Sequence, residues 1–474
     1  MNSAHEKTQT PSQDYRSLAW IAAMALFMQS LDATILNTAL PAISRSLHQS
    51  PLEMELAIIS YALTVAAVIP LSGWIADRFG TLFTFRGAVF IFTLGSLACA
   101  LSADLDTLVA SRILQGVGGA LMLPVARLAI IRNVAKSQLI VAWNLMAMAG
   151  LIGPVLGPIL GGWIVTHTSW PWIFLINIPI GIIGMTVVGK YMTNNYGNVG
   201  KLDWLGFLLF AAGLVTTTYG LDVIAENLAN KSKAITLISI GALLLASYGL
   251  YALRVNNPLI PLSLLRFRTF NLGILGNLFI RISGSGVPFL LPLMWQVAFN
   301  FDAQTAGFML APIAISSILA KSFATKILYR FGYRNSLVVN AILMAAAIAA
   351  MSRFTQDTPL WLYVPIMMWY GCCMSLMFTA VNTLTVCDLP DHLAGSGSTV
   401  LSMMQQLGIG VGIAISSVIL ALFREHFGQT DDLASAFSHT FLVSSLFAVG
   451  LACIMACLHP EDGNNLRNRK PQKN

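Results

Sequence analysis

The chain has 474 residues, of which 56% are hydrophobic and 10% are charged, whereas a soluble domain carries about 25% charged residues. Together with a mean hydropathy of +0.72, this composition excludes a soluble globular class. The net charge of +7 does not indicate nucleic-acid binding, because the positive charges lie in short loops between apolar runs. We therefore expect an all-α polytopic membrane protein that lies in a lipid bilayer.

Fourteen apolar runs are candidates for membrane-spanning helices, which need about 20 residues each. The N-terminal segment 1–17 lacks the layout of a cleavable signal, and the run after it is long enough to remain as a span. The longest hydrophilic connections, near 191–202 and 254–269, leave no room for a soluble domain. In chain order the expected spans are 18–40, 55–75, 86–103, 108–130, 139–166, 171–190, 203–222, 234–253, 270–297, 304–326, 336–354, 359–383, 398–423 and 436–458.

The positions of lysine and arginine predict the orientation of these spans. With the N-terminus inside, the inner segments hold 20 of the 27 basic residues and the outer segments hold five. The remaining two, Arg112 and Arg281, lie within spans. Because cytoplasmic loops carry an excess of Lys and Arg, we expect the tails 1–17 and 459–474 both to be cytoplasmic.

An internal repeat supports the count of spans. The sequence RFG occurs at 78–80, after the second span, and again at 330–332, after the tenth. If the repeating unit is six helices, the halves are 18–190 and 254–458, and 191–253 carries two inserted spans. Transporters built from paired halves place the substrate site between the halves, near the middle of the membrane.

One acidic residue lies well inside an expected span. Asp32 is the only charged residue between Ser17 and Ser44, about eight residues or ~12 Å from the outer end of its helix. Arg112 enters the fourth span from outside to a comparable depth, so the two side chains can lower each other's burial cost. Asp32 is therefore a candidate proton carrier with Arg112 as its modulator, and a static ion pair that fixes helix packing is the alternative.

Arg281 lies about eleven residues into the ninth span, near the middle of the membrane. Three roles remain open for it: attraction of an anionic substrate group, a second partner for Asp32, or bonding to backbone carbonyls. Further polar and aromatic residues in spans are candidates for substrate contact, although such residues also face lipid or neighbouring helices. The candidate substrate-binding residues are Tyr61, Asn144, Arg281, Gln296, Gln405 and Gln406.

Two further segments suggest moving parts. In GLIGPVLGPILGGW (150–163), glycines recur every three or four residues and form a face on which another helix can pack closely. Its two prolines each remove a backbone hydrogen bond, so a kink that acts as a hinge or seal is expected. The segment GWIADRFG (73–80) places Asp77 at a helix end, which suggests a charged latch between helices or simply a solvated loop. The candidate gating residues are Gly73, Asp77, Arg78, Gly80, Gly153, Pro154, Gly157, Pro158 and Gly161.

These segments resemble the major facilitator superfamily, and within it the fourteen-span drug:proton antiporters (EmrB/QacA type). GWIADRFG is similar to the family's motif between the second and third spans, although TLF follows where the motif ends in basic residues. RILQGVGGA (112–120) resembles the fourth-span motif, whose arginine is tied to proton coupling. GLIGPVLGPILGG (150–162) resembles the fifth-span antiporter motif, and LDATILNTALP and WPWIFLINIPIG (170–181) resemble the first and sixth spans.

The resemblance implies a proton-coupled exporter of drugs or other small amphipathic molecules in the bacterial inner membrane. Its partners would be protons and a small-molecule substrate, with the proton gradient in place of a cofactor; a periplasmic or outer-membrane adaptor is left open. The sequence contains no metal-ligand spacing, nucleotide-binding loop or nucleophile–base set, so an enzyme is not expected. The alternatives are export of an endogenous metabolite or anionic chelator anchored by Arg281, and a non-transporting sensor that tolerates neutralisation of Asp32.

Overall fold

A computed structural model describes residues 15–51, 53–134, 138–197, 200–226, 230–255, 258–427 and 433–463. Within these ranges the chain is helical and contains no strand. Thirteen helices in the described ranges are long and apolar enough to cross a membrane. Helix α6, with 29 residues, supplies one more span, so the expected fold of fourteen membrane-spanning helices is confirmed.

The N-terminal half begins with α1 and ends with α8. Its elements are α1 (Tyr15–Leu47), α2 (Glu55–Val68), η1 (Ile69–Leu71), α3 (Ser72–Phe79), α4 (Thr81–Ala100), α5 (Leu105–Asn133), α6 (Leu139–His167), α7 (Trp172–Leu175) and α8 (Asn177–Tyr191). The inserted pair follows as α9 (Trp204–Glu226) and α10 (Lys231–Ala252). The expected spans are therefore found in order, with the second and sixth each divided into shorter helical pieces.

The C-terminal half runs from η3 to α17. Its elements are η3 (Leu262–Arg266), α11 (Arg268–Gly284), α12 (Val287–Leu293), the π-helical turn η4 (Met294–Ala298), α13 (Ala303–Phe331), α14 (Tyr333–Met351), α15 (Leu360–Val386), α16 (Asp391–Phe427) and α17 (Leu433–Ala456). With six spans on each side of the inserted pair, the arrangement of two six-helix halves is also confirmed.

The ninth span is not the single continuous helix that the apolar run 270–297 predicts. It consists of α11, α12 and η4, and the break falls at the sequence SGSG, residues 283–286. Pro288, in the first turn of α12, has no N–H to continue the hydrogen bonds of α11. The hydroxyl of Tyr370 donates to the carbonyl oxygen of Gly284 at 2.8 Å, which satisfies a backbone group at the break.

Three aspartates explain where long helices begin. The carboxylates of Asp104 and Asp302 accept backbone N–H groups at the starts of α5 and α13, as N-cap residues do. The backbone N–H of Thr107 holds the pKa of the Asp104 carboxyl below its usual range. Asp203 accepts from the Gly206 N–H at 2.8 Å and from the Tyr251 hydroxyl, so it joins the start of α9 to the end of α10.

The repeated RFG sequence has the same backbone conformation in both halves. Gly80 has φ +89° between α3 and α4, and Gly332 has φ +79° between α13 and α14. L-residues with side chains rarely adopt this conformation. A Cβ at Gly80 would also overlap the side chain of Asn194, which follows α8. The repeat predicted from sequence is therefore a matched pair of helix-to-helix bends.

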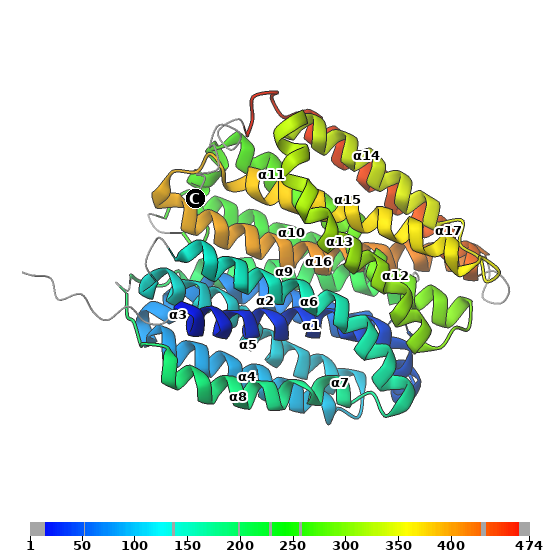
Figure 1. Cartoon of the computed structure of the whole chain (residues 1–474), viewed down its shortest axis with the longest axis horizontal. Coiled ribbons are helices and arrows are strands. Elements are labelled where there is room, and N and C mark those ends of the chain that lie inside the picture. Colours follow the sequence, from blue (N-terminus) through cyan, green and yellow to red (C-terminus); the bar gives the residue numbers. More distant parts are fainter. Residues whose placement is uncertain are drawn as a thin grey trace, which may run out of the picture.

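The two halves pack side by side, and several helix pairs connect them. In Figure 1 the N-terminal helices lie in the lower part and α11–α17 in the upper part, with α6 against α13, α2 against α16, and α1 against α12. Helices α9 and α10 pack on each other, and α9 also contacts α2 and α16. Fourteen crossings return the chain to the side where α1 begins; we call this side the termini end and the other side the opposite end.

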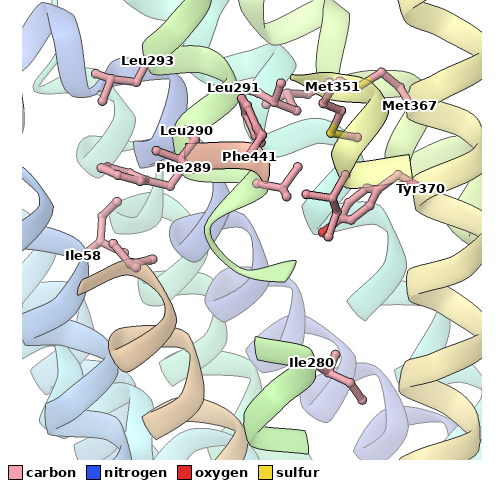
Figure 2. Close-up of a cluster of buried hydrophobic side chains, with 14 of the residues drawn as sticks. Ile58, Ile280, Phe289, Leu290, Leu291, Leu293, Met351, Met367, Tyr370 and Phe441 are labelled. Atoms are coloured by element: carbon pink, nitrogen blue, oxygen red, sulfur yellow. The ribbon is translucent and has the colours of Figure 1, made fainter. Parts of the chain in front are cut away.

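At the opposite end the halves share one buried core. The side-chain amide of Gln296 donates to the carbonyl oxygen of Thr38 at 3.0 Å, across the boundary between the halves. Figure 2 shows Ile58 of α2 beneath Phe289 and Leu290 of α12, and all three belong to one buried hydrophobic cluster. The opposite end is therefore closed by side chains from both halves.

Candidate functional site

Asp32 lies at the centre of a buried polar network in the N-terminal half. Its side chain is fully buried halfway along α1, and its Oδ2 forms an ion pair with Nη1 of Arg112 at 2.7 Å. The sequence placed these two groups at comparable depth, and the structure brings them into direct contact. This is the only ion pair among the described residues in which both side chains are buried.

Arg112 is fixed from several directions by groups of α2 and α5. Its Nε donates to the carbonyl oxygen of Ala57 at 2.9 Å, and its Nη1 donates to Oε1 of Gln115 at 2.5 Å. The guanidinium carbon lies 4.4 Å from the ring centroid of Tyr61 and 5.9 Å from that of Phe174. Cation–π contact with Tyr61 adds to the ion pair and keeps the arginine in place.

Uncharged residues complete the network around the Asp32 carboxylate. Nε2 of Gln115 donates to Oδ1 of Asp32 at 2.7 Å and to the hydroxyl oxygen of Ser96 at 2.8 Å. Nδ2 of Asn177, the first residue of α8, lies 3.4 Å from the same Asp32 oxygen and 3.3 Å from Ser96. The carboxylate thus has three donor contacts from α5 and α8, and the sequence predicted only the one from Arg112.

The arrangement stabilises an ionised carboxylate as long as it stays assembled. Two desolvated charges are tolerated in a membrane only when they are paired and hydrogen-bonded. Withdrawal of Arg112 would leave the buried carboxylate with the uncharged donors Gln115 and Asn177 and without a counter-charge. Among the described residues, the counter-charge of Asp32 therefore comes from Arg112 alone.

Arg281 lies in α11, in the other half, and contacts different groups. Its guanidinium carbon lies 4.9 Å from the ring centroid of Phe378, and it forms no ion pair with any described residue. Within the described part of the chain its Nε has no hydrogen-bond partner, and neither does Oδ1 of the buried Asn277, one turn earlier on α11. The C-terminal half therefore holds a half-buried cation with no carboxylate partner among the described residues.

The other candidate substrate residues are dispersed. Tyr61 belongs to the Arg112 network, and Gln296 lies at the seam between the halves. Gln405 donates to Oδ1 of Asn382 at 2.9 Å within the C-terminal half, and Gln406 is half-buried on the same helix, α16. The side chain of Asn144 lies outside the described part of the chain.

The glycines of α6 pack against α1 of the same half. A Cβ at Gly153 would overlap the Ser30 hydroxyl, and one at Gly161 would lie 2.5 Å from the Ile35 carbonyl oxygen. On another side of α6, a Cβ at Gly162 would overlap the carbonyl oxygen of Ala303 in α13. Pro154 and Pro158 both lie within one continuous helix. Helix α6 thus packs closely on α1 within its own half and on α13 across the boundary between the halves.

Gly157→Ala should destabilise the protein measurably because its new methyl group has no space. A Cβ there would overlap Oγ1 of Thr34 and lie 3.0 Å from the backbone nitrogen of Ile35. Overpacking of this kind costs about 1–3 kcal/mol. The measurement is thermal unfolding of the purified protein in detergent. Gly249→Ala is the matched control, since nothing lies within 4 Å of a Cβ at that helical position; equal melting temperatures for the two variants would contradict the prediction.

The segment 73–80 forms a latch, but within one half. Oδ1 of Asp77 at the end of α3 pairs with Nη2 of Arg132 at the end of α5, at 2.5 Å. The backbone N–H of Gly197 donates to the carbonyl oxygen of Asp77 at 3.1 Å. Arg78 is exposed and lies over the ring of Trp74 at 5.5 Å. The acid of the motif therefore joins α3 to α5, and its arginine takes no part in the pair.

Asp77→Asn should lower the free energy of unfolding by less than about 1 kcal/mol, because both partners are about one-quarter exposed. The difference from wild type should shrink in ~1 M salt, where the screening length falls to about 3 Å. Arg132→Gln should cause the same loss, and the double variant should lose no more than either single change. Additive losses in thermal unfolding would show that the two residues act independently.

Two further acids are buried at the opposite end, and the sequence did not predict their burial. Glu55, the first residue of α2, is 1% exposed, and its Oε2 has no hydrogen-bond partner among the residues that the structure describes. Asp222 in α9 is 5% exposed and lies close enough to act electrostatically on Glu55. Each lies at the end of an expected span, where an acidic residue is expected to be exposed to water. Asp32 is therefore not the only buried acid in the helices.

The comparisons with known proteins agree with this architecture. Residues 22–413 match the Major Facilitator Superfamily. "Probable transport protein HsrA" of Haemophilus influenzae is 56% identical over 97% of this chain and 99% of its own. "Putative multidrug resistance protein MdtD" of an Escherichia coli O7:K1 strain is 40% identical over 94% of both chains.

Solved structures with little sequence identity share the fold. An auto-inhibited peptide transporter of the POT family has a TM-score of 0.68 and is 14% identical, with 96% of this chain and 99% of that chain covered. The nucleoside transporter NupG has a TM-score of 0.63 at 13% identity, with 93% and 98% covered. By sequence and by fold, the chain belongs to the major facilitator superfamily, and it is a multi-pass membrane transporter and not an enzyme.

Proposed function

We propose that this transporter is a proton-coupled antiporter that exports small amphipathic molecules across the bacterial inner membrane, with both termini in the cytoplasm. The buried Asp32–Arg112 pair is the observation that carries the proposal. A charged pair is costly in a membrane and is a functional candidate by default. The relatives named as multidrug resistance proteins support the cargo class, and the excess of basic residues on the side of the termini supports the orientation.

Exchange follows from competition for one carboxylate. When Arg112 is paired with Asp32, the carboxylate is ionised and no proton is carried. When a movement of the halves separates the pair, Asp32 is open to one side of the membrane and takes up either a proton or cargo. Because Asp32 cannot hold both at once, inward proton movement drives outward cargo movement.

The test is reconstitution into liposomes that contain a pH-sensitive dye, with a panel of lipophilic cations and organic anions added as cargo. We expect at least one lipophilic cation to cause proton movement in proportion to its own counter-transport. Protein-free liposomes and liposomes with collapsed proton gradients serve as controls. Failure of the whole panel to move protons with wild-type protein would contradict the antiporter proposal.

Arg281 favours a second candidate, export of an anionic metabolite or chelator. It is a half-buried cation with no carboxylate partner in the described chain, and an anionic group would satisfy it. The organic-anion arm of the panel separates the two candidates. If an anion is the cargo, Arg281→Gln should raise its apparent KM at least tenfold while proton movement driven by lipophilic cations is unchanged.

A further inference from the structure

An apolar groove lies on the C-terminal half, away from the network described above. It has a volume of about 570 Å³ and is formed by α13, α14 and α15. Its lining residues on α13 extend from Ala320 to Phe331, the last residue of that helix, so the groove occupies the half of the bundle near the termini end. This volume falls within the range of about 300–1,000 Å³ that holds drug-sized ligands.

The groove faces the bilayer. Phe323, Phe331 and Val339 line it and are each more than half exposed. Helix α13 packs on α6 of the other half through Ala303 and Gly307. The exposed lining therefore places the groove on the outer surface of the helix bundle, the surface that meets lipid in a membrane protein.

Two cations stand beside the aromatic lining. Nζ of Lys326 lies 6.0 Å from the ring centroid of Phe323, and the guanidinium carbon of Arg330 lies 5.6 Å from that of Phe331. Neither cation forms an ion pair with a described residue. The polar lining residues Asn335 and Ser336 lie in the first turn of α14, at the same end of the groove.

An unsatisfied polar atom completes this end of the groove. Ser336 is 6% exposed, and its hydroxyl oxygen has no hydrogen-bond partner in the described part of the chain. Buried hydroxyl groups normally have a partner, so one that lines a cavity without a partner points to a missing ligand atom. A phosphate oxygen supplies both an acceptor for this hydroxyl and the counter-charge for the two cations.

We propose that the groove is a specific site for an anionic phospholipid. One acyl chain fills the apolar part between α13, α14 and α15, and the phosphate binds at the termini end beside Lys326, Arg330 and Ser336. Basic residues near a membrane surface attract anionic lipid head groups. The site is independent of the Asp32 network, and it does not depend on proton coupling.

The test uses Trp369, which lines the groove on α15. A variant that keeps Trp369 as the only one of ten tryptophans is reconstituted in phosphatidylcholine with increasing fractions of brominated phosphatidylglycerol or brominated phosphatidylcholine. We expect the phosphatidylglycerol to quench Trp369 fluorescence at lower mole fractions. The preference should fall about fivefold for each cation removed in K326Q and R330Q.

Lys231→Gln with Lys233→Gln is the matched control, because it removes the same charge at the exposed start of α10, at the opposite end. This double variant should keep the preference. Equal quenching by both lipids, or a preference that survives K326Q/R330Q, would overturn the proposal. Relief of quenching by a transported molecule would assign the groove to cargo instead and would also overturn it.

A second measurement avoids the tryptophan replacements. Native mass spectrometry of the otherwise unaltered protein should show at least one retained phosphatidylglycerol. K326Q/R330Q should lose that lipid, and K231Q/K233Q should retain it. If the wild-type protein releases phosphatidylglycerol as readily as phosphatidylcholine, the groove holds no specific lipid and the inference is wrong.

Discussion

Asp32→Asn should reduce cargo-driven proton exchange to the level of protein-free liposomes. The amide has nearly the same shape as the carboxylate but cannot take up and release a proton. The dye-loaded liposome assay described above measures the effect directly. Asp106→Asn, a change at an acid in the first turn of α5, is the matched control and should leave exchange unchanged.

The same substitution also removes the counter-charge of Arg112, and that structural effect must be separated from the loss of coupling. A buried pair that loses one partner is destabilised by about 3–5 kcal/mol, whereas removal of both partners is often neutral. Asp32→Asn with Arg112→Gln should therefore restore the melting temperature without restoring proton exchange. Recovery of exchange in this double variant would show that the pair has only a packing role.

Gly307→Ala should open the seam at the opposite end and reduce transport by about 5- to 150-fold. A Cβ at Gly307 would overlap the carbonyl oxygen of Pro158 and lie 3.1 Å from its carbonyl carbon, so α13 and α6 must move apart. Overpacking costs about 1–3 kcal/mol, which shifts a two-state equilibrium by about 5- to 150-fold. A cysteine introduced at Thr166, beside the seam in a cavity of about 350 Å³, should react faster with a membrane-impermeant maleimide.

Gly410→Ala is the control for this experiment. Gly410 also lies where the halves meet, but its Cβ would make an ordinary contact of 3.6 Å with Leu63. This variant should transport normally and should leave the reaction rate at position 166 unchanged. Normal transport by Gly307→Ala would mean that the α6–α13 contact can relax without affecting the transport cycle.

The fold was predictable because its main determinants are local. The length of an apolar run predicts whether a segment crosses the bilayer. The number of basic residues in a connecting loop predicts on which side of the membrane that loop lies. The break in the ninth span was not predicted, because the uncharged residues 283–286 interrupt the apolar run only briefly and hydropathy does not register where backbone hydrogen bonds stop. The repetition of RFG predicted where the two matching segments lie. It did not predict the positive φ angles of Gly80 and Gly332.

The charged part of the candidate site was predictable for a different reason. A charge in a membrane needs a partner, and Asp32 and Arg112 are a carboxylate and a guanidinium at one depth. Gln115 and Asn177 carry no such constraint, because uncharged amides occur in many positions. The partner of Asp77 could not be inferred either, since it depends on how the ends of α3 and α5 meet. The sequence suggested Gln296 as a candidate substrate contact. In the structure its side-chain amide donates to the carbonyl oxygen of Thr38, across the boundary between the halves.

The order in which the Asp32 network is assembled has a consequence for biogenesis. All the described partners of the carboxylate lie at or before Asn177 in a chain of 474 residues. Domains generally fold N-terminal first during synthesis, so the ion pair can close before α11 has been translated. The energetic penalty of placing Asp32 in the membrane is therefore offset early, and the nascent N-terminal half need not wait for its C-terminal counterpart to shelter the charge.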